Sequence, residues 1–433
     1  MKILVKVTAS LCVVAAAFPI TILTGNFLNR DPEISAPDVR PTAELVARGE
    51  YLTRMADCQA CHQVKGGEPF TGGRAFQLPF GTLYSTNITP DPETGIGAWT
   101  DNDFVRALHR GIRPDGENLY PAFPYTSYTA LSREDVIAIK SYLFTLKPVR
   151  APAKKNELSF PFNQRWGLAL WNGFFLDDRR FQPDPAVPAA VNRGDYIANA
   201  LGHCGECHTP RTLAFSLSDR VYAGARLEGW NAYNITSHKE YGIGAWSDGD
   251  LRKYLVDGHT PGQGVATGPM GEVVEYSLRH LKDDDASALI SYLRTVPPRA
   301  EGFTANAEKA SLMTQASELL PPKSAQMSEP GKRVFERNCA SCHAWNGTGG
   351  QQQTAALRGL RSIYDPSAAN LLQVILHGTE PSSLPGRSAP MPAFASLNDA
   401  EIADLVNFIR RYVGSNGSEI VAKDVADARE HKH

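Results

Sequence analysis

Apolar residues recur at helical spacing in three stretches of the chain, and the first and third of them follow a helix-start sequence. These stretches cover residues 132–146, 284–296 and 398–413. A polar cap, an acidic first turn and apolar residues at i, i+3 and i+4 are typical of an amphipathic helix. Residues 42–55 open in the same way. The pattern predicts a mainly α-helical chain with helices in all four segments.

The chain contains an internal repeat. The paired segments are Arg48–Tyr51 with Arg193–Tyr196, Asn87–Thr89 with Asn234–Thr236, and Gly95–Trp99 with Gly242–Trp246, the last two pairs being identical. A shorter and more distant copy begins at Gly331. At 433 residues the chain is too long for one hydrophobic core. We therefore expect three tandem helical domains, at residues 42–150, 189–297 and 328–415.

Two connectors join these domains, and a tail follows the third. Residues 151–188 form a strap that is Pro-rich at its ends and aromatic in its centre, and residues 298–327 form a linker. Trp166 and Phe174 lie on one helical face of the strap. This face either packs as a strap across the first two domains or forms a patch for a partner subunit. Residues 416–433 form a polar tail that we expect to be disordered.

Six of the seven cysteines lie in three copies of the motif C-x-x-C-H. The copies are Cys58, Cys61 and His62; Cys204, Cys207 and His208; and Cys339, Cys342 and His343. This motif is typical of covalent haem attachment, in which the thiols form thioethers and the histidine binds the iron. The copies lie about 140 residues apart, so each lacks the second cysteine pair of a structural zinc site. The sequence predicts three haems c, one in each domain.

Methionine is the expected ligand on the other side of the iron in an electron-transfer protein. Met391, in Ala-Pro-Met-Pro, and Met270, in Gly-Pro-Met-Gly, hold matching places in domains 3 and 2, and we predict both as axial ligands. The matching loop of domain 1, residues 120–125, has no methionine, and Met55 is expected on the wrong side of the ring. Three alternatives remain open: an iron with no sixth ligand, a methionine lent by the linker (Met313 or Met327), or a histidine such as His109.

Composition and the N-terminus narrow the class of function. The chain has 44 basic and 46 acidic residues and a net charge of −2, which provides no basic surface for nucleic acid. No Gly-rich dinucleotide loop and no nucleophile elbow is found, so we predict no catalytic residues. Residues 1–30 are basic and then apolar, as in a signal peptide or an uncleaved anchor. Either predicts export to the periplasmic side of the cytoplasmic membrane.

Taken together, the chain resembles the triple-haem cytochrome c subunits of bacterial membrane-bound dehydrogenases. The resemblance covers residues 42–415 and rests on the three C-x-x-C-H motifs, Asn-Ile-Thr with Gly-Ile-Gly-Ala-Trp, Tyr-Pro-Ala-Phe-Pro-Tyr at 120–125, and residues 165–171. It implies three cytochrome c-like domains and a large catalytic partner that holds a flavin, PQQ or molybdenum cofactor, and it leaves room for a small subunit. It also implies contact with the membrane surface and ubiquinone as electron acceptor.

Three functions compete at this stage. The first is an electron-transfer subunit of a complex that oxidises alcohols, sugars or gluconate. The second is a haem enzyme that uses an open iron in domain 1. The third is a free-standing periplasmic electron carrier.

Overall fold

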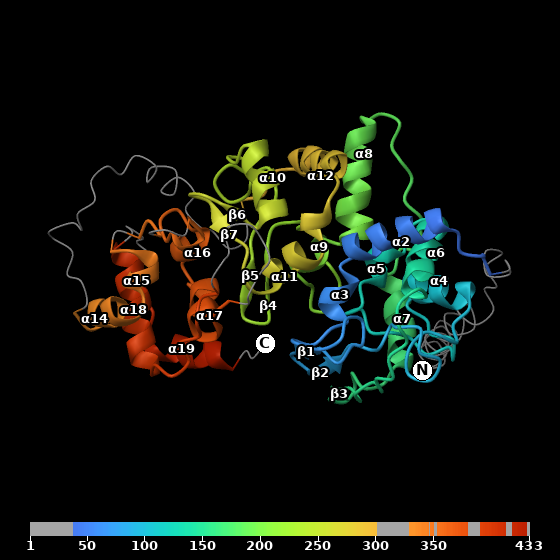
Figure 1. Cartoon of the computed structure of the whole chain (residues 1–433), viewed down its shortest axis with the longest axis horizontal. Helices are drawn as coiled ribbons and strands as arrows, with labels where there is room; N and C mark the ends of the chain where they lie inside the picture. Colours follow the sequence, from blue (N-terminus) through green and yellow to red (C-terminus); the bar gives the residue numbers. More distant parts are fainter. Residues whose placement is uncertain are drawn as a thin grey trace, which may run out of the picture. The chain divides into compact units, whose positions relative to one another are not determined.

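The computed structural model describes residues 38–300, 329–345, 347–349, 353–379, 390–412 and 418–430. The chain divides into two compact units, residues 1–182 with 199–203, and residues 183–198 with 204–433. Unit 1 holds the first predicted domain and most of the strap, and unit 2 holds the third domain and all of the second except residues 199–203. The signal or anchor at residues 1–30 and nearly all of the linker lie outside the described residues. Figure 1 and the helices given below confirm the prediction of a mainly helical chain.

Each domain is built on a crossing of its first and last helices. The pairs are α2 (Ala43–Met55) with α6 (Arg133–Leu143), α8 (Ala189–Asp195) with α12 (Asp283–Thr295), and α14 (Glu329–Asn338) with α18 (Asp399–Tyr412). A glycine lies at each crossing. A Cβ atom on Gly49, Gly194 or Gly331 would come within 1.8, 2.0 or 2.1 Å of a backbone carbonyl oxygen of the partner helix. The same close contact in all three domains supports their common origin as repeats.

The helix ends follow the start sequences. Thr42 caps α2 by accepting a hydrogen bond from the amide of Leu45, and Ser132 caps α6 by accepting from that of Asp135. In α18 the Asn398 and Glu401 side chains accept from each other's backbone amides, as in a capping box. The predicted helices are therefore confirmed, with bounds shifted by at most three residues.

A middle helix of each domain ends at a glycine with positive φ. The helices are α4 (Asp101–Arg110), α10 (Asp248–Asp257) and α17 (Ala369–His377), followed by Gly111, Gly258 and Gly378 with φ of 63°, 68° and 71°. Glycine adopts this conformation without strain, and it turns the chain sharply toward the loop that follows. In domain 2 that loop is a short hairpin, β6 (His259–Thr260) with β7 (Gly264–Val265), followed by α11 (Gly268–Tyr276).

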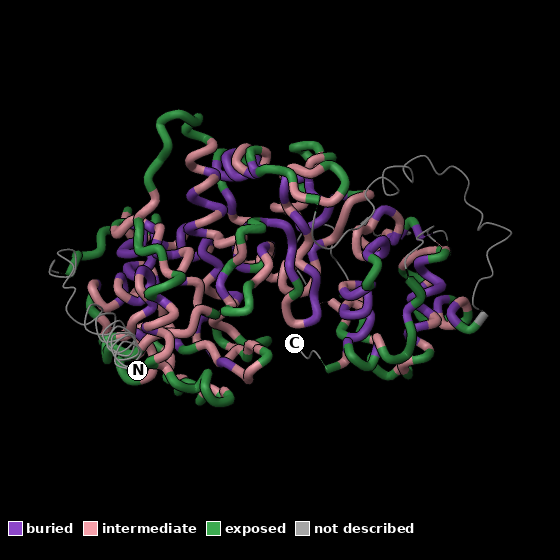
Figure 2. Tube along the Cα trace, turned by 180° about the vertical axis from the view of Figure 1, so that it is seen from behind, coloured by how far each residue is buried: buried purple, intermediate pink, exposed green. Residues whose placement is uncertain are grey.

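The remaining elements are short. The C-x-x-C-H motifs lie at three short helices, α3 (Cys58–Cys61), α9 (Gly205–His208) and α15 (Ala340–His343). Further short helices are α5 (Tyr125–Tyr128), α16 (Arg361–Tyr364) and the π-helix Tyr196–Leu201. Two antiparallel sheets are β1 (Ala75–Leu78), β2 (Gly81–Tyr84) and β3 (Glu157–Leu158), and β4 (Ala225–Leu227) with β5 (Trp230–Ala232). The buried residues, purple in Figure 2, lie mainly on the helices.

The Asn-Ile-Thr sequences fix the loops that follow the sheets. In domain 1 the Asn87 side chain donates to the carbonyl of Val149 at 2.7 Å, and its oxygen accepts from the Thr89 amide and hydroxyl. In domain 2 Asn234 donates to the carbonyl of Arg299 at 2.8 Å. Each asparagine thus ties its loop to the chain leaving the closing helix of the same domain.

Domains 2 and 3 share a polar contact inside unit 2. Asn231 of β5 donates through its side chain to Asp365 at 2.7 Å and exchanges two backbone-to-side-chain hydrogen bonds with Asn370 of α17. Arg361 of α16 donates to the carbonyl of Tyr241 and lies over the ring of Tyr233. The sequence did not indicate this contact.

The strap forms α7 (Trp166–Phe175), which belongs to unit 1. One face is buried through Ala169 and Asn172, and the Asn172 oxygen accepts from the Tyr125 hydroxyl at 2.7 Å. Trp166 and Phe174 are 62 % and 65 % exposed, so they do not form the packed face.

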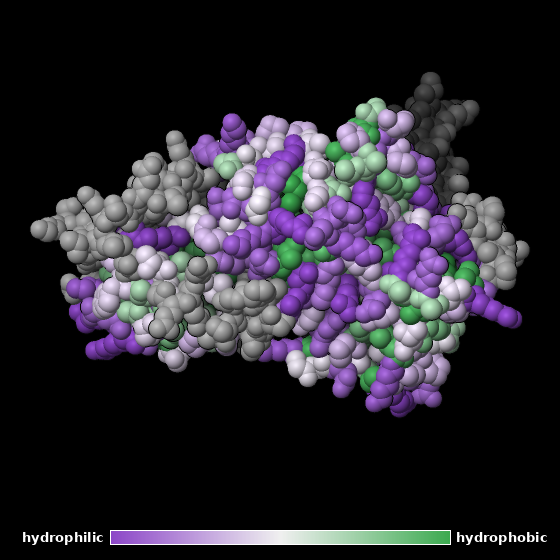
Figure 3. All heavy atoms as spheres, turned by 45° about the horizontal axis from the view of Figure 1, so that its top comes forward, coloured by the Kyte–Doolittle hydropathy of each residue, from purple (hydrophilic) through white to green (hydrophobic). Residues whose placement is uncertain are grey.

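The face of the molecule drawn in Figure 3 is largely hydrophilic, with apolar residues between the hydrophilic ones.

The expectation of a disordered tail is wrong for residues 418–430. They contain helix α19 (Ala422–Arg429), whose Val425 and Ala428 are buried in the core of domain 3. Arg429 also pairs with Asp399 at 2.7 Å. Although the tail is polar overall, it has two apolar residues at i and i+3, which is enough to dock one helical face.

Among the described residues, no helix is long and apolar enough to cross a membrane.

Candidate functional site

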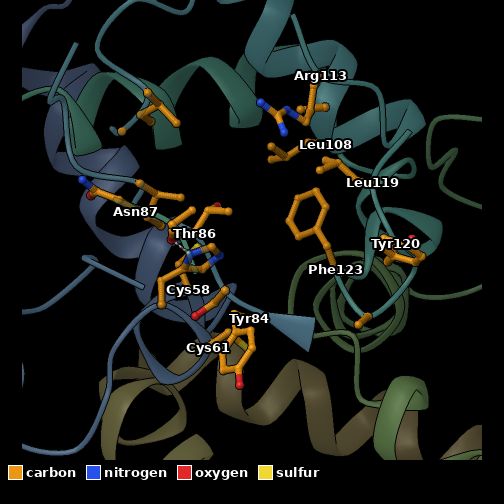
Figure 4. A pocket seen from close by; sticks show the side chains of 18 of the residues that line it. Cys58, Cys61, Tyr84, Thr86, Asn87, Leu108, Arg113, Leu119, Tyr120 and Phe123 are labelled. Atoms are coloured by element: carbon orange, nitrogen blue, oxygen red, sulfur yellow. Dashed lines mark hydrogen bonds between the residues drawn. The ribbon is translucent and has the colours of Figure 1, made fainter. Parts of the chain in front are cut away.

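Domain 1 contains a large cavity lined by the first C-x-x-C-H motif. Cys58, Cys61 and His62 lie on its wall, and its volume is about 500 Å³, within the range of small-molecule and cofactor sites. Figure 4 shows Cys58, Cys61 and Thr86 on one side of the cavity and Leu108, Leu119 and Phe123 across from them. Asp57, with φ of 52°, turns the chain between α2 and the motif helix α3. The opening helix therefore delivers both thiols to one wall.

The motif histidines make the same contact in all three domains. Nδ1 lies 2.6 Å from a backbone carbonyl oxygen, that of Thr86 for His62, Tyr233 for His208 and Ala355 for His343. A carbonyl at this distance accepts a proton from Nδ1, which leaves Nε2 as the free lone pair for a metal. The sequence alone offers the Pro210 carbonyl, two residues after His208, as an acceptor for this proton. That expectation is wrong, because the Pro210 carbonyl accepts from the amide of Ser218. The acceptor thus comes from a loop distant in sequence.

Burial favours the uncharged forms of the motif side chains. It raises the pKa of Cys58 to about 12, of Cys204 to about 11 and of Cys339 to about 12. It also lowers the pKa of His62, His208 and His343, opposed by the hydrogen bond to each carbonyl. A neutral imidazole is the form that binds a metal. None of the six motif cysteines forms a disulfide.

Domain 3 brings the predicted methionine to its motif. Met391 lines one cavity with Cys339, Cys342 and His343. Its loop is tied to the end of α17, because the Thr379 amide donates to the Met391 carbonyl at 2.9 Å and the Thr379 hydroxyl accepts from the Met391 amide at 2.8 Å. Val265 and Thr267 of domain 2 line the same cavity.

Met270 of domain 2 lies in the first turn of α11 and is partly buried. The helix begins against β5, because a Cβ atom on Gly268 would lie 2.4 Å from the Trp230 ring. Gly268 has φ of 53°, a conformation that favours glycine. The glycine therefore lets the methionine loop approach the sheet closely.

Domain 1 has no methionine on its cavity among the described residues. Met55 is 3 % exposed inside α2, and it does not line the cavity. His109 is also buried away from the lining, where burial and the nearby Arg180 lower its pKa to about 3. Met313 and Met327 lie outside the described residues. Phe123 occupies the lining opposite the motif, and the sequence analysis did not single it out.

The donor set of domains 1 and 3 fits a covalent haem. Each cavity has two thiols and one imidazole held with Nε2 free, and its other walls are largely apolar. The three matching His–carbonyl contacts extend the fit to domain 2. Two thioethers to one porphyrin need two thiols one helical turn apart. This spacing is present within α3, and in α9 and α15 together with their N-cap residues Cys204 and Cys339.

Comparison with known proteins gives the same result. The family model described as Cytochrome c matches residues 46–147 and 328–412. The chain is 39 % identical over 414 residues to the gluconate 2-dehydrogenase cytochrome c subunit of Pantoea cypripedii, covering 89 % of each protein. It is 36 % identical to the alcohol dehydrogenase (quinone) cytochrome c subunit of Gluconobacter oxydans, covering 89 % of this chain and 82 % of that protein. It is also 36 % identical to the fructose dehydrogenase cytochrome subunit of Gluconobacter japonicus, covering 95 % and 87 %.

Proposed function

We propose that this chain, which belongs to the family of dehydrogenase cytochrome c subunits, carries three haems c. It relays electrons from a catalytic dehydrogenase subunit to ubiquinone. The observation that carries the proposal is the threefold contact of a motif histidine with a backbone carbonyl at 2.6 Å. A domain that had lost its haem would be under no constraint to keep this contact.

Each haem, when bound, supplies one-electron exchange at its iron. The residues of the chain attach each haem, supply its ligands and orient them. Cys58 and Cys61, Cys204 and Cys207, and Cys339 and Cys342 are the proposed thioether attachments. His62, His208 and His343 are the proposed proximal ligands, oriented by their carbonyl partners, and Met270 and Met391 are the proposed distal ligands of domains 2 and 3. The apolar walls of the cavities in domains 1 and 3 exclude water and so help to set the potentials of these two sites.

Domains 2 and 3 are held together by direct contacts. Thr267, three residues before Met270, lines the cavity of domain 3. The buried Asp365 and Asn231 fix the two domains at the same place. These contacts support direct transfer between the sites of domains 2 and 3 within unit 2.

The exposed aromatic face of α7 is the proposed contact surface for the catalytic subunit. Trp166, Phe174 and Phe175 are 62 %, 65 % and 41 % exposed, a concentration typical of binding anchors. Just before α7, Arg165 lines the cavity of domain 1, so the face adjoins that site. The relatives are named as subunits of dehydrogenases, which supports a large dehydrogenase as the occupant. The chain would work on the periplasmic side of the cytoplasmic membrane, at its surface.

The test is reduction and reoxidation of the purified complex. The catalytic subunit that co-purifies with the full chain is supplied in turn with gluconate, fructose, sorbitol or ethanol, and haem reduction is followed by absorbance. We expect one donor to reduce the haems at a rate that supports turnover, and a soluble ubiquinone analogue to reoxidise them. A chain that purifies alone, or haems that no dehydrogenase reduces, would contradict the proposal and favour a free-standing carrier.

A further inference from the structure

Phe123 holds the position in domain 1 that Met270 holds in domain 2. In domain 1 the Gly111 carbonyl accepts from the Leu119 amide at 2.6 Å, and in domain 2 the Gly258 carbonyl accepts from the Ala266 amide at 2.8 Å. The fourth residue after each donor is Phe123 or Met270. The two loops therefore run in the same register.

The small hairpins inside these loops confirm that register. Ile112 pairs with Asn118 in domain 1, and His259 pairs with Val265 in domain 2. Each pair directly follows its glycine and encloses a turn of equal length. No insertion or deletion separates the two loops, so the chain has phenylalanine where the repeat has methionine.

The Phe123 ring is held in this place by its neighbours. It lies 5.6 Å from the ring of Tyr128 and 6.4 Å from that of Tyr125, measured between centroids. Both tyrosines are buried, and their hydroxyls donate to the carbonyl of Ala56 and to Asn172, each at 2.7 Å. The ring therefore has a fixed support on the side of the cavity opposite Cys58 (Figure 4).

The other side chains on this half of the cavity are poor iron ligands. Leu108 and Leu119 have no donor atom, and Arg113 is cationic. Tyr120 donates its hydroxyl to the carbonyl of Phe162 at 2.8 Å, and burial raises its pKa, so the phenol stays protonated. His203 also lines the cavity, but its ring packs edge-on against Tyr128.

We propose that domain 1 is a binding site for small neutral diatomic ligands of ferrous haem, of the class of carbon monoxide and nitric oxide. The inference rests on the proposed haem of domain 1. Phe123 supplies an apolar wall and no sulfur, so the sixth position is left to an exogenous ligand, while Met270 and Met391 close that position in domains 2 and 3. A haem without a methionine ligand also has a lower potential than a His/Met haem.

The test is carbon monoxide titration of the reduced, purified full chain, followed by the optical difference spectrum. We expect one carbon monoxide per chain, bound by one haem of the three. Phe123→Met should weaken binding by at least tenfold and raise the potential of one haem, whereas Phe123→Leu, the matched apolar control, should bind as the wild type does. Met391→Phe should create a second binding haem, which shows that the phenylalanine itself leaves the position open.

Three results would overturn the inference. One is a wild-type chain with three haems and no carbon monoxide shift. Another is a shift that appears only after His203→Ala or after the double change Met313→Ala with Met327→Ala, since that would identify the residue that fills the position. The third is a shift unchanged in Phe123→Met. A haem count of two, with none on Cys58 and Cys61, would instead contradict the proposed function.

Discussion

The Tyr233 hydroxyl donates a hydrogen bond to the Asp365 carboxylate at 3.1 Å, across the contact of domains 2 and 3. The backbone carbonyl of the same tyrosine accepts from the proposed iron ligand His208 at 2.6 Å. One residue thus joins the orientation of a haem ligand to the docking of the neighbouring domain. Asp365 is 1 % exposed, and Asn231 donates to it as well.

We expect Asp365→Ala to lower the free energy of unfolding by about 3 kcal/mol, because it leaves the Asn231 amide and the Tyr233 hydroxyl without their acceptor and the partly buried Arg361 without a nearby negative charge. Urea denaturation and the rate of proteolytic release of domain 3 measure the effect. Asp427→Ala, which breaks the exposed pair with Lys423, is the matched control and should leave both unchanged. Equal behaviour of the two variants would show that the contact does not hold the domains together.

The helix crossing of domain 2 should tolerate no side chain at Gly194. A Cβ atom there would lie 2.0 Å from the carbonyl oxygen of Ala288, so Gly194→Ala must push α8 and α12 apart. We expect a loss of about 2 to 3 kcal/mol in the free energy of unfolding. Gly167→Ala in α7, where no atom lies within 4 Å, is the control and should be neutral or slightly stabilising. Thermal unfolding that is the same for both would refute the close crossing.

Acid should destabilise unit 1 through His109. Its pKa is about 3 in the folded chain, against 6.5 in the unfolded chain, because of burial and the nearby Arg180. The unfolded chain therefore binds a proton from about pH 6.5 downward that the folded chain does not bind. The contribution of His109 is complete above pH 6.5 and is lost progressively as the pH falls toward 3.

His109→Gln removes this titration, so the loss of stability between pH 7 and pH 4 should shrink by about 3 kcal/mol. Denaturation curves at a series of pH values between 7 and 4 measure it. The same pH slope in wild type and variant would mean that other groups control acid unfolding.

The aromatic face of α7 gives a prediction about assembly. Changing Trp166 and Phe174 to serine removes two exposed rings without touching the buried Ala169 and Asn172. We expect the melting temperature to stay constant and the yield of co-purified catalytic subunit to fall at least tenfold. Leu213→Ser, at a fully exposed apolar residue outside α7, is the control. Unchanged assembly would assign the catalytic subunit to another surface.

The sequence predicted those parts of the fold that depend on local pattern. Thr42 and Ser132 start helices where their capping sequences lie. Long-range partners had no such signal. The carbonyl of Tyr233, rather than that of Pro210, accepts from His208, because the acceptor depends on how a distant loop folds back.

Composition gave a wrong prediction for the tail and no prediction for the buried Asp365. The polar tail concealed Val425 and Ala428, whose burial docks α19. Nothing in the sequence alone marked Asp365 as a buried partner of domain 2, because a single aspartate before Pro366 is typical of an exposed turn. The place of Phe123 could have been read from the equal loop lengths of domains 1 and 2, which align it with Met270.

The measurement that tests the central claim most directly is the number of haems per chain. Purified chain is denatured, its covalently retained haem is measured as the pyridine complex, and the protein is quantified by amino-acid analysis. We predict three haems per chain, and two after Cys58→Ala with Cys61→Ala. Two haems in the wild type, or a count unchanged in that variant, would contradict the assignment of a haem to each domain.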